Sequence, residues 1–305
     1  MDFGSYLPLL LPLLAVPLVL LAARRLHPAA ATWLTAVSSV VLTLGAALSL
    51  ALFTLAGLAG LSIVVDIGHL SPSVLRRADI TDRPVDVIAA LLLLALCGTA
   101  VVATIRRVRA LRTARELAGA GAELVVLAQD QPVAHAVPGQ PGRIVVSTGM
   151  LTRLTPPERS ALFAHERAHL DRSHHLFVAV VDVFAAANPL LRPLRGTVRY
   201  TTERWADELA ARGVGSRSVV ATAVGKAALA TKDAARDPVL LAASGGEVPR
   251  RVAALLVTPP ARRLWQVLTA PTTVIALIAL VLTATSAGCA IEAAGDLQRV
   301  FMLAH

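Results

Sequence analysis

The sequence predicts a mainly α-helical membrane protein, with four transmembrane helices and a cytoplasmic α+β domain built on a small antiparallel sheet. The chain of 305 residues is 55% hydrophobic and its mean hydropathy is +0.66, which is too apolar for a soluble domain. A long polar segment, Arg106 to Gln266, separates the third apolar run from the fourth and is the expected working domain.

Four apolar runs have the length of membrane spans. Arg24 and Arg25 close the first run, whereas a cleaved signal peptide carries its positive charge ahead of the apolar stretch, so we expect a retained helix. The stretch from Gly57 to Val65 is expected to be a bent extension of the second span, and Asp66 to Pro84 a polar loop. The predicted spans are Tyr6 to Ala23, Thr32 to Leu55, Val85 to Ile105 and Pro271 to Ile291.

Arginine clusters orient these spans. All the clusters fall on one side if the spans alternate, and that side is cytoplasmic by the positive-inside rule. The net charge of +9 therefore reflects topology in the cell membrane, and with only 4% aromatic residues we expect no direct nucleic-acid binding. The predicted parts are a three-span region 1–105, a cytoplasmic domain 106–266, and a fourth helix with a short outer tail 267–305; the N-terminus lies outside. The clusters are Arg24 and Arg25, then Arg106, Arg107, Arg109 and Arg112, and finally Arg262 and Arg263.

The cytoplasmic segment begins with an arginine-rich helix that ends at Gly119 to Gly121. Three short strands follow, separated in part by the turn residues Pro138 to Gly142. Leu176 to Ala187 is apolar but too short to cross a bilayer, so it is either a core helix or one lying against the membrane. Asn188 and Pro189 stop it. The expected strands are Glu123 to Ala128, Val133 to Val137 and Arg143 to Ser147.

The motif His165-Glu166-Arg167-Ala168-His169 predicts a zinc site. Two histidines four residues apart share one face of a helix and can hold one metal ion. Glu166, between them, can act as general base toward a metal-bound water. The segment also reads as a helix independently, because Thr155-Pro156-Pro157-Glu158 is a capping box with proline at the first helical position.

Glu203 is the expected third ligand, which would complete a site of two histidines and one glutamate. Asp207 is four residues further on, so it should point the same way and accept a hydrogen bond from a ligand histidine. Glu208 is the nearest rival and should face elsewhere. His174 and His175, five and six residues after His169, are expected on the polar surface.

The segment from Glu123 to Leu256 resembles the gluzincin membrane peptidases, in particular the BlaR/MecR-type antirepressor peptidases. The resemblance rests on Arg143 to Leu151, on the His165 motif, on Asn188-Pro189-Leu190 before the helix from Glu203 to Ala210, and on Arg251 to Leu256. The HtpX and CAAX-prenyl-protease group shares the metal motifs. About fourteen residues follow the fourth span, so we expect no penicillin-binding sensor domain and no direct β-lactam sensing.

The resemblance implies a zinc endopeptidase with one zinc per chain, acting on a cytoplasmic protein and contacting membrane lipid. The expected substrate is a winged-helix transcriptional repressor in a signalling or resistance response. Quality control of membrane proteins and a non-catalytic zinc scaffold are the alternatives. We expect the substrate to pair with a free edge of the strand containing Ile144, Val145 and Val146. Arg251 and His135 are candidates for the oxyanion partner.

Overall fold

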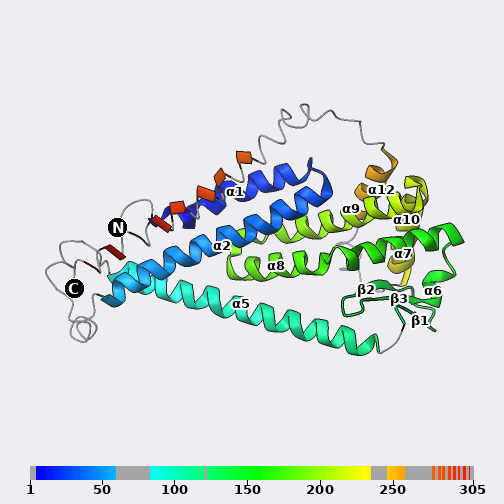
Figure 1. The fold of residues 1–305 in the computed structure, drawn as a ribbon, viewed down its shortest axis with the longest axis horizontal. Helices are drawn as coiled ribbons and strands as arrows, with labels where there is room; N and C mark the ends of the chain where they lie inside the picture. Colours follow the sequence, from blue (N-terminus) through cyan, green and yellow to red (C-terminus); the bar gives the residue numbers. More distant parts are fainter. Residues whose placement is uncertain are drawn as a thin grey trace. The chain divides into compact units, whose positions relative to one another are not determined.

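The computed structural model describes residues 5–59, 83–119, 122–234 and 246–257, together with short pieces between 277 and 302. The chain divides into two compact units. Unit 1 comprises 1–105, 180–197 and 267–305; unit 2 comprises 106–179 and 198–266. Figure 1 shows the helices and strands along the chain. The predicted loop from Asp66 to Pro84 lies almost entirely outside the described residues, and the predicted fourth span lies partly outside them.

Unit 1 is helical. Helix α1 covers Leu7–Ala23, α2 covers Pro28–Ala59, and α5 covers Arg83–Leu117, of which the part up to Ile105 belongs to this unit. Leu50 and Phe53 of α2 pack against Ala89 of α5. The sequence predicted a bent extension from Gly57 onward. Helix α2 instead runs on without a break from Gly57 to Ala59, the last described residue of this stretch.

Two of these helices are long and apolar enough to span a membrane, at Pro28–Leu58 and Pro84–Leu117. Helix α1 is shorter, with 17 residues, at the lower limit of the spanning range. Large apolar side chains of α5 such as Leu91, Leu94 and Val101 are more than half exposed. Such an apolar surface needs a non-aqueous partner, so these helices suggest association with a membrane.

Unit 2 contains a three-stranded sheet of β1 (Leu124–Leu127), β2 (Ala134–Val137) and β3 (Arg143–Ser147). The prediction of an antiparallel sheet is wrong, because β3 is central and pairs antiparallel with β2 but parallel with β1. The segment after β1 carries the chain past β3 to its other edge, so β1 and β2 do not pair. The sheet is therefore mixed.

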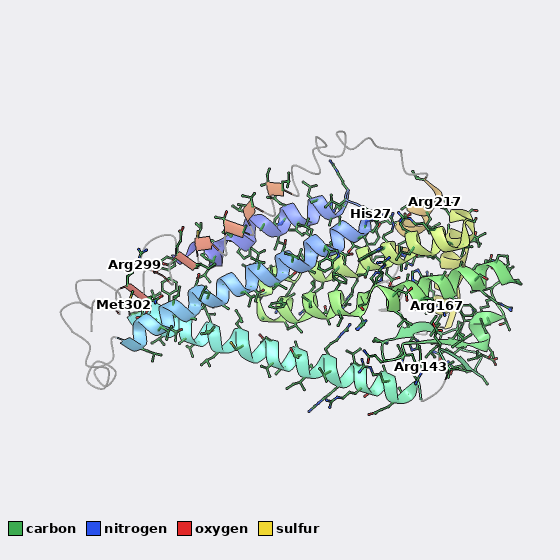
Figure 2. All side chains as sticks on the ribbon, viewed as in Figure 1. His27, Arg143, Arg167, Arg217, Arg299 and Met302 are labelled. Atoms are coloured by element: carbon green, nitrogen blue, oxygen red, sulfur yellow. The ribbon has the colours of Figure 1, made fainter. Side chains whose placement is uncertain are left out.

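Several further helices lie wholly or partly in unit 2. The α7 helix packs against β2, β3 and α10, and α10 in turn packs against α12. The core joins Ala161 of α7, Ala210 of α9, Val220 of α10 and Leu255 of α12. Arg217, labelled in Figure 2, adds a polar link between helices by donating to Glu208 and to the carbonyl oxygens of Ala254 and Leu255. The bounds are α7 Pro156–Asp171, α8 His174–Ala187, α9 Leu194–Val214, α10 Arg217–Ala234 and α12 Glu247–Leu256; α6 (Thr148–Leu151) and the 3-10 turn η2 (Pro189–Leu191) are short.

Candidate metal centre

Helix α7 presents His165 and His169 one turn apart, toward the same side. The helix begins where the sequence predicted, because the carboxylate of Glu158 accepts the backbone N–H of Thr155 at 2.8 Å and so satisfies the first turn. Ala161 and Leu162 are buried in two core clusters of unit 2, which holds the rotation of α7 about its axis. Two Nε2 atoms, of His165 and His169, then lie 3.1 Å apart.

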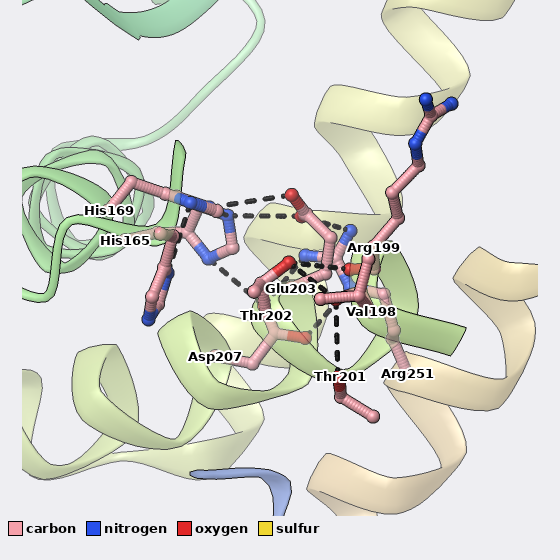
Figure 3. Close-up of polar contacts among 10 residues, drawn as sticks. His165, His169, Val198, Arg199, Thr201, Thr202, Glu203, Asp207 and Arg251 are labelled. Carbon is pink, nitrogen blue, oxygen red and sulfur yellow. Dashed lines mark hydrogen bonds and ion pairs between the residues drawn. The ribbon is translucent and has the colours of Figure 1, made fainter. Parts of the chain in front are cut away.

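Helix α9 brings Glu203 to these two nitrogens (Figure 3). One Glu203 carboxylate oxygen lies 3.4 Å from His165 Nε2 and the other lies 3.4 Å from His169 Nε2. In a tetrahedral zinc site, with bonds of about 2.0–2.1 Å, ligand atoms lie about 3.3 Å from one another. Each carboxylate oxygen thus faces a different histidine, and one ligand atom from each of the three side chains lies within 4.8 Å of the others, so the three side chains could hold one zinc ion.

The second nitrogen of each histidine also has a neighbour. His165 Nδ1 lies 3.0 Å from the carboxylate of Asp207, which is fully buried. His169 Nδ1 lies 3.1 Å from Nδ1 of His174. A neutral imidazole that binds metal through Nε2 carries its proton on Nδ1 and donates it. In this structure the two Nδ1 atoms face Asp207 and His174, respectively.

The surface position predicted for His174 is wrong. Its side chain is 1% exposed and its ring lies 4.8 Å from the ring of Trp205 on α9. Helix α7 ends at Asp171, and Ser173 adopts a left-handed conformation with φ 50°, so the chain reverses before His174. The prediction assumed that the helix of His169 continues through His174. Because the helix ends before His174, the direction of this side chain cannot be derived from helical rotation.

Arg251, from α12, closes the site on the carboxylate side. Its guanidinium donates to both oxygens of Asp207, at 2.8 and 2.7 Å, and lies 2.8 Å from Glu203. These contacts hold two acidic side chains at the positions from which they face His165. Arg251 was considered as an oxyanion partner, and the structure places its guanidinium on Asp207 and Glu203.

The site is arranged for a positive charge. Burial raises the pKa of Glu203, but hydrogen bonding to His165 and the charge of Arg251 outweigh it and hold that pKa well below its ordinary value. Burial lowers the pKa of His165, and here the carboxylates of Asp207 and Glu203 win, raising it to about 10. Two ionised carboxylates around a buried histidine stabilise a cation, which can be a proton or a metal ion.

Glu166 lies in the same wall, and its side chain is buried. Burial raises the pKa of Glu166, while the backbone N–H of Ala136 donates to its carboxylate and opposes that rise. A carboxylate whose pKa is raised toward neutrality is a better proton acceptor for catalysis near pH 7. Its placement beside His165 and at the end of an N–H from β2 suits a general base.

Two cavities meet at Glu166. The first, of about 360 Å³, is lined by polar side chains, including His135, His174, His175 and two arginines. The second, of about 180 Å³, is mainly apolar, with Met150, Leu162 and Val220 in its wall. His165, Glu166 and Glu203 line both, so a chain lying across Glu166 can reach both cavities.

The other predicted residues fall in two groups. Glu208, the rival ligand, pairs instead with Arg204 and Arg217. Ile144, Val145 and Val146 belong to β3, which is paired on both sides, so the expectation of a free edge there is wrong. The edge of the sheet near Glu166 is β2, whose residues Ala134 and Ala136 line the first cavity.

Comparison with known proteins matches residues 101–184 to Peptidase family M48. This stretch contains the sheet, α7 and both histidines of the motif. No curated protein and no solved structure matches the chain. The family match supports a metallopeptidase.

Proposed function

We propose that the protein is a membrane-bound zinc endopeptidase. The observation that carries the proposal is the convergence of His165, His169 and Glu203, with 3.1–3.4 Å between donor atoms, directly beside a buried Glu166. Two histidines and one glutamate are the ligand set of one class of catalytic zinc sites. The match to a metallopeptidase family supports the same chemistry.

The residues have distinct roles in this proposal. His165, His169 and Glu203 would hold the ion, and Asp207 and His174 would orient the two imidazoles. A zinc ion held by these residues would lower the pKa of a bound water molecule and polarise a peptide carbonyl. Glu166 takes the proton of the attacking water and passes it to the leaving amine.

We further propose that the substrate pairs with β2. In an antiparallel ladder, hydrogen-bonded and outward-facing residues alternate. Val133 accepts the N–H of Ser147 through its carbonyl, so the alternation turns the backbone groups of Ala134 and Ala136 away from β3. An effect of the Ala136 backbone N–H on the pKa of Glu166 agrees with this direction. An extended peptide along this edge would lie beside the general base.

Glu166→Ala tests the assignment of roles. The purified variant should retain about one zinc per chain and lose proteolysis, since Glu166 serves the water and not the ion. Glu203→Ala should lose the metal instead. Metal content by atomic emission and cleavage of an unfolded protein substrate are measured side by side. Absence of zinc in the wild type, or full proteolysis in Glu166→Ala, would reject the proposal.

The physiological substrate is proposed to be a cytoplasmic repressor of the winged-helix class. Cleavage between its DNA-binding and dimerisation parts would destroy the two-site geometry that such dimers need. Comparison of protein fragments in cells carrying wild type or Glu166→Ala tests this. One or two fragments from a DNA-binding protein support the repressor. A broad set of membrane-protein fragments, with transcription unchanged, supports quality control instead.

A further inference from the structure

Arg107 is an arginine in the wall of the larger cavity beside the candidate metal centre. It lies on α5, within unit 2, and its side chain lines the larger cavity beside His135, Glu166 and His169. Its Nε is buried and has no hydrogen-bond partner among the described residues. Its single hydrogen bond there is a long one, 3.5 Å from a terminal nitrogen to the carbonyl oxygen of His175.

Four other arginines of unit 2 are paired with acidic groups. Arg251 binds Asp207 and Glu203, Arg167 binds Glu123, and Arg204 and Arg217 share Glu208. In the part of the chain that the structure describes, no carboxylate forms an ion pair with Arg107. A guanidinium has five donors and cannot lose its charge, so a partly buried one without an acid is poorly satisfied.

We propose that Arg107 is an anion subsite that binds a carboxylate of the substrate peptide. Arg199 lines the same cavity and adds a second positive charge to its wall. Of the two acidic residues in this wall, Glu203 already contacts Arg251 and both histidines, and Glu166 accepts from Ala136. A carboxylate from the substrate is the group that complements Arg107, because guanidinium and carboxylate pair through two parallel hydrogen bonds.

The carboxylate has two possible sources, an Asp or Glu side chain near the cleaved bond and the free C-terminus of a short substrate. The inference rests on the proposed peptidase function. The test uses the full-length, zinc-loaded protein in detergent and a peptide pool prepared in two forms, with free and with amidated C-termini. Cleavage sites are mapped by mass spectrometry for wild type, Arg107→Gln, Arg107→Lys and Arg109→Gln.

Arg109 is the matched control, since it is an exposed arginine two residues further along α5 and does not line the cavity. We expect acidic residues to be preferred about tenfold over their amides at one fixed position, a preference lost in Arg107→Gln, partly kept in Arg107→Lys and unchanged in Arg109→Gln. Cleavage at a fixed distance from a free C-terminus, abolished by amidation and by Arg107→Gln, identifies the terminal carboxylate as the source.

A binding experiment separates this inference from the proposed function. Fluorescent peptides that differ only in Glu against Gln are titrated into Glu166→Gln protein, with and without Arg107→Gln, and anisotropy is measured. Tighter binding of the Glu peptide that needs Arg107 supports the subsite even if the wild type cleaves nothing. Equal binding of the two peptides, or a carboxylate preference that survives Arg107→Gln in either experiment, overturns it.

Discussion

At the scale of single residues, His174 contacts the candidate metal ligand His169 at the nitrogen that does not face the proposed ion. Its Nδ1 lies 3.1 Å from Nδ1 of His169, its ring lies 4.8 Å from the ring of Trp205, and it is almost completely buried. We expect His174→Ala to weaken zinc binding about 10–100-fold, because the ring of His169 loses its orienting partner. Competition with a chromophoric chelator measures the affinity directly, without reference to proteolysis.

His174→Asn should recover part of that loss, since its amide oxygen can accept the same proton. His175→Ala is the control, because His175 lines the cavity and makes no contact with His169 that the structure shows. If His174→Ala and His175→Ala weaken zinc binding equally, the effect of His174→Ala comes from general damage to the fold and not from the contact with His169.

Asp207 supports the other histidine, and its loss should be more damaging. The side chain is fully buried, lies 3.0 Å from His165 and accepts both Arg251 bonds. Asp207→Asn keeps the size but removes the charge that balances a buried guanidinium. We expect zinc affinity to fall about 10–100-fold and thermal stability to fall with it. Glu208→Gln, which perturbs a pair away from the candidate ligands, should leave zinc affinity unchanged.

The sequence allowed His165, Glu166, His169, Glu203 and Asp207 to be proposed together, because spacing along two helices determines which side chains share a face. The roles of His174 and Arg251 could not be predicted in this way, for two different reasons. His174 follows a left-handed residue at which helical geometry ends. Arg251 was singled out, but its pairing with Asp207 depends on how α12 packs in unit 2, and no local pattern encodes that packing.

At the scale of elements, Gly149 controls the junction between β3 and α7. Its N–H donates to the carbonyl of Gln129, and a Cβ at this position would lie 1.9 Å from the carbonyl oxygen of Asp130. Gly149→Ala must therefore displace backbone, and we expect a loss of about 1–3 kcal/mol, typical of overpacking. Gly213→Ala, in open space on α9, should be neutral or mildly stabilising. Thermal unfolding in detergent compares them; equal melting temperatures would contradict the expectation.

Glu158 links α7 to α10 by its contact with Lys226, at 2.7 Å. The hydrogen bond from Lys226 is the main cause that lowers the pKa of Glu158, with the capping contact to Thr155 adding to it. A lowered carboxyl pKa contributes stability above the unfolded value of about 4.3, and this is lost as pH falls through the folded value. Glu158→Gln keeps an oxygen that can cap Thr155 but removes the charge that faces Lys226, so it should destabilise by up to about 1 kcal/mol at pH 7 and by less at low pH.

Unfolding of wild type and Glu158→Gln at pH 7 and pH 3.5 measures this dependence, with Glu123→Gln as a control for an exposed pair. A difference that does not shrink in acid would show that the charge of Glu158 is unimportant.

The three strands were predictable from their β-branched and apolar residues, but their order was not. Alternation along a strand reports which face is buried and contains nothing about whether β1 pairs with β2 or crosses to β3.

At the scale of the whole molecule, the chain combines two long apolar helices with a unit that carries the candidate metal centre. The positions of Pro28–Leu58 and Pro84–Leu117 were predictable because hydropathy alone defines them. The arginines after the second of these helices, from Arg106 to Arg112, are the observation from which we predict that unit 2 faces the cytoplasm and that the N-terminus is outside.

Cysteine labelling tests this topology. In a chain with Cys97 and Cys289 replaced by serine, Ser218→Cys places a thiol at an exposed position of unit 2. We expect an impermeant thiol reagent to leave it unlabelled in intact cells and to label it once the membrane is opened, whereas Ser73→Cys, in the predicted outer loop, should react in both. The orientation decides which proteins reach Glu166. Labelling of Ser218→Cys but not Ser73→Cys in intact cells would place the site outside and eliminate every cytoplasmic substrate, the repressor included.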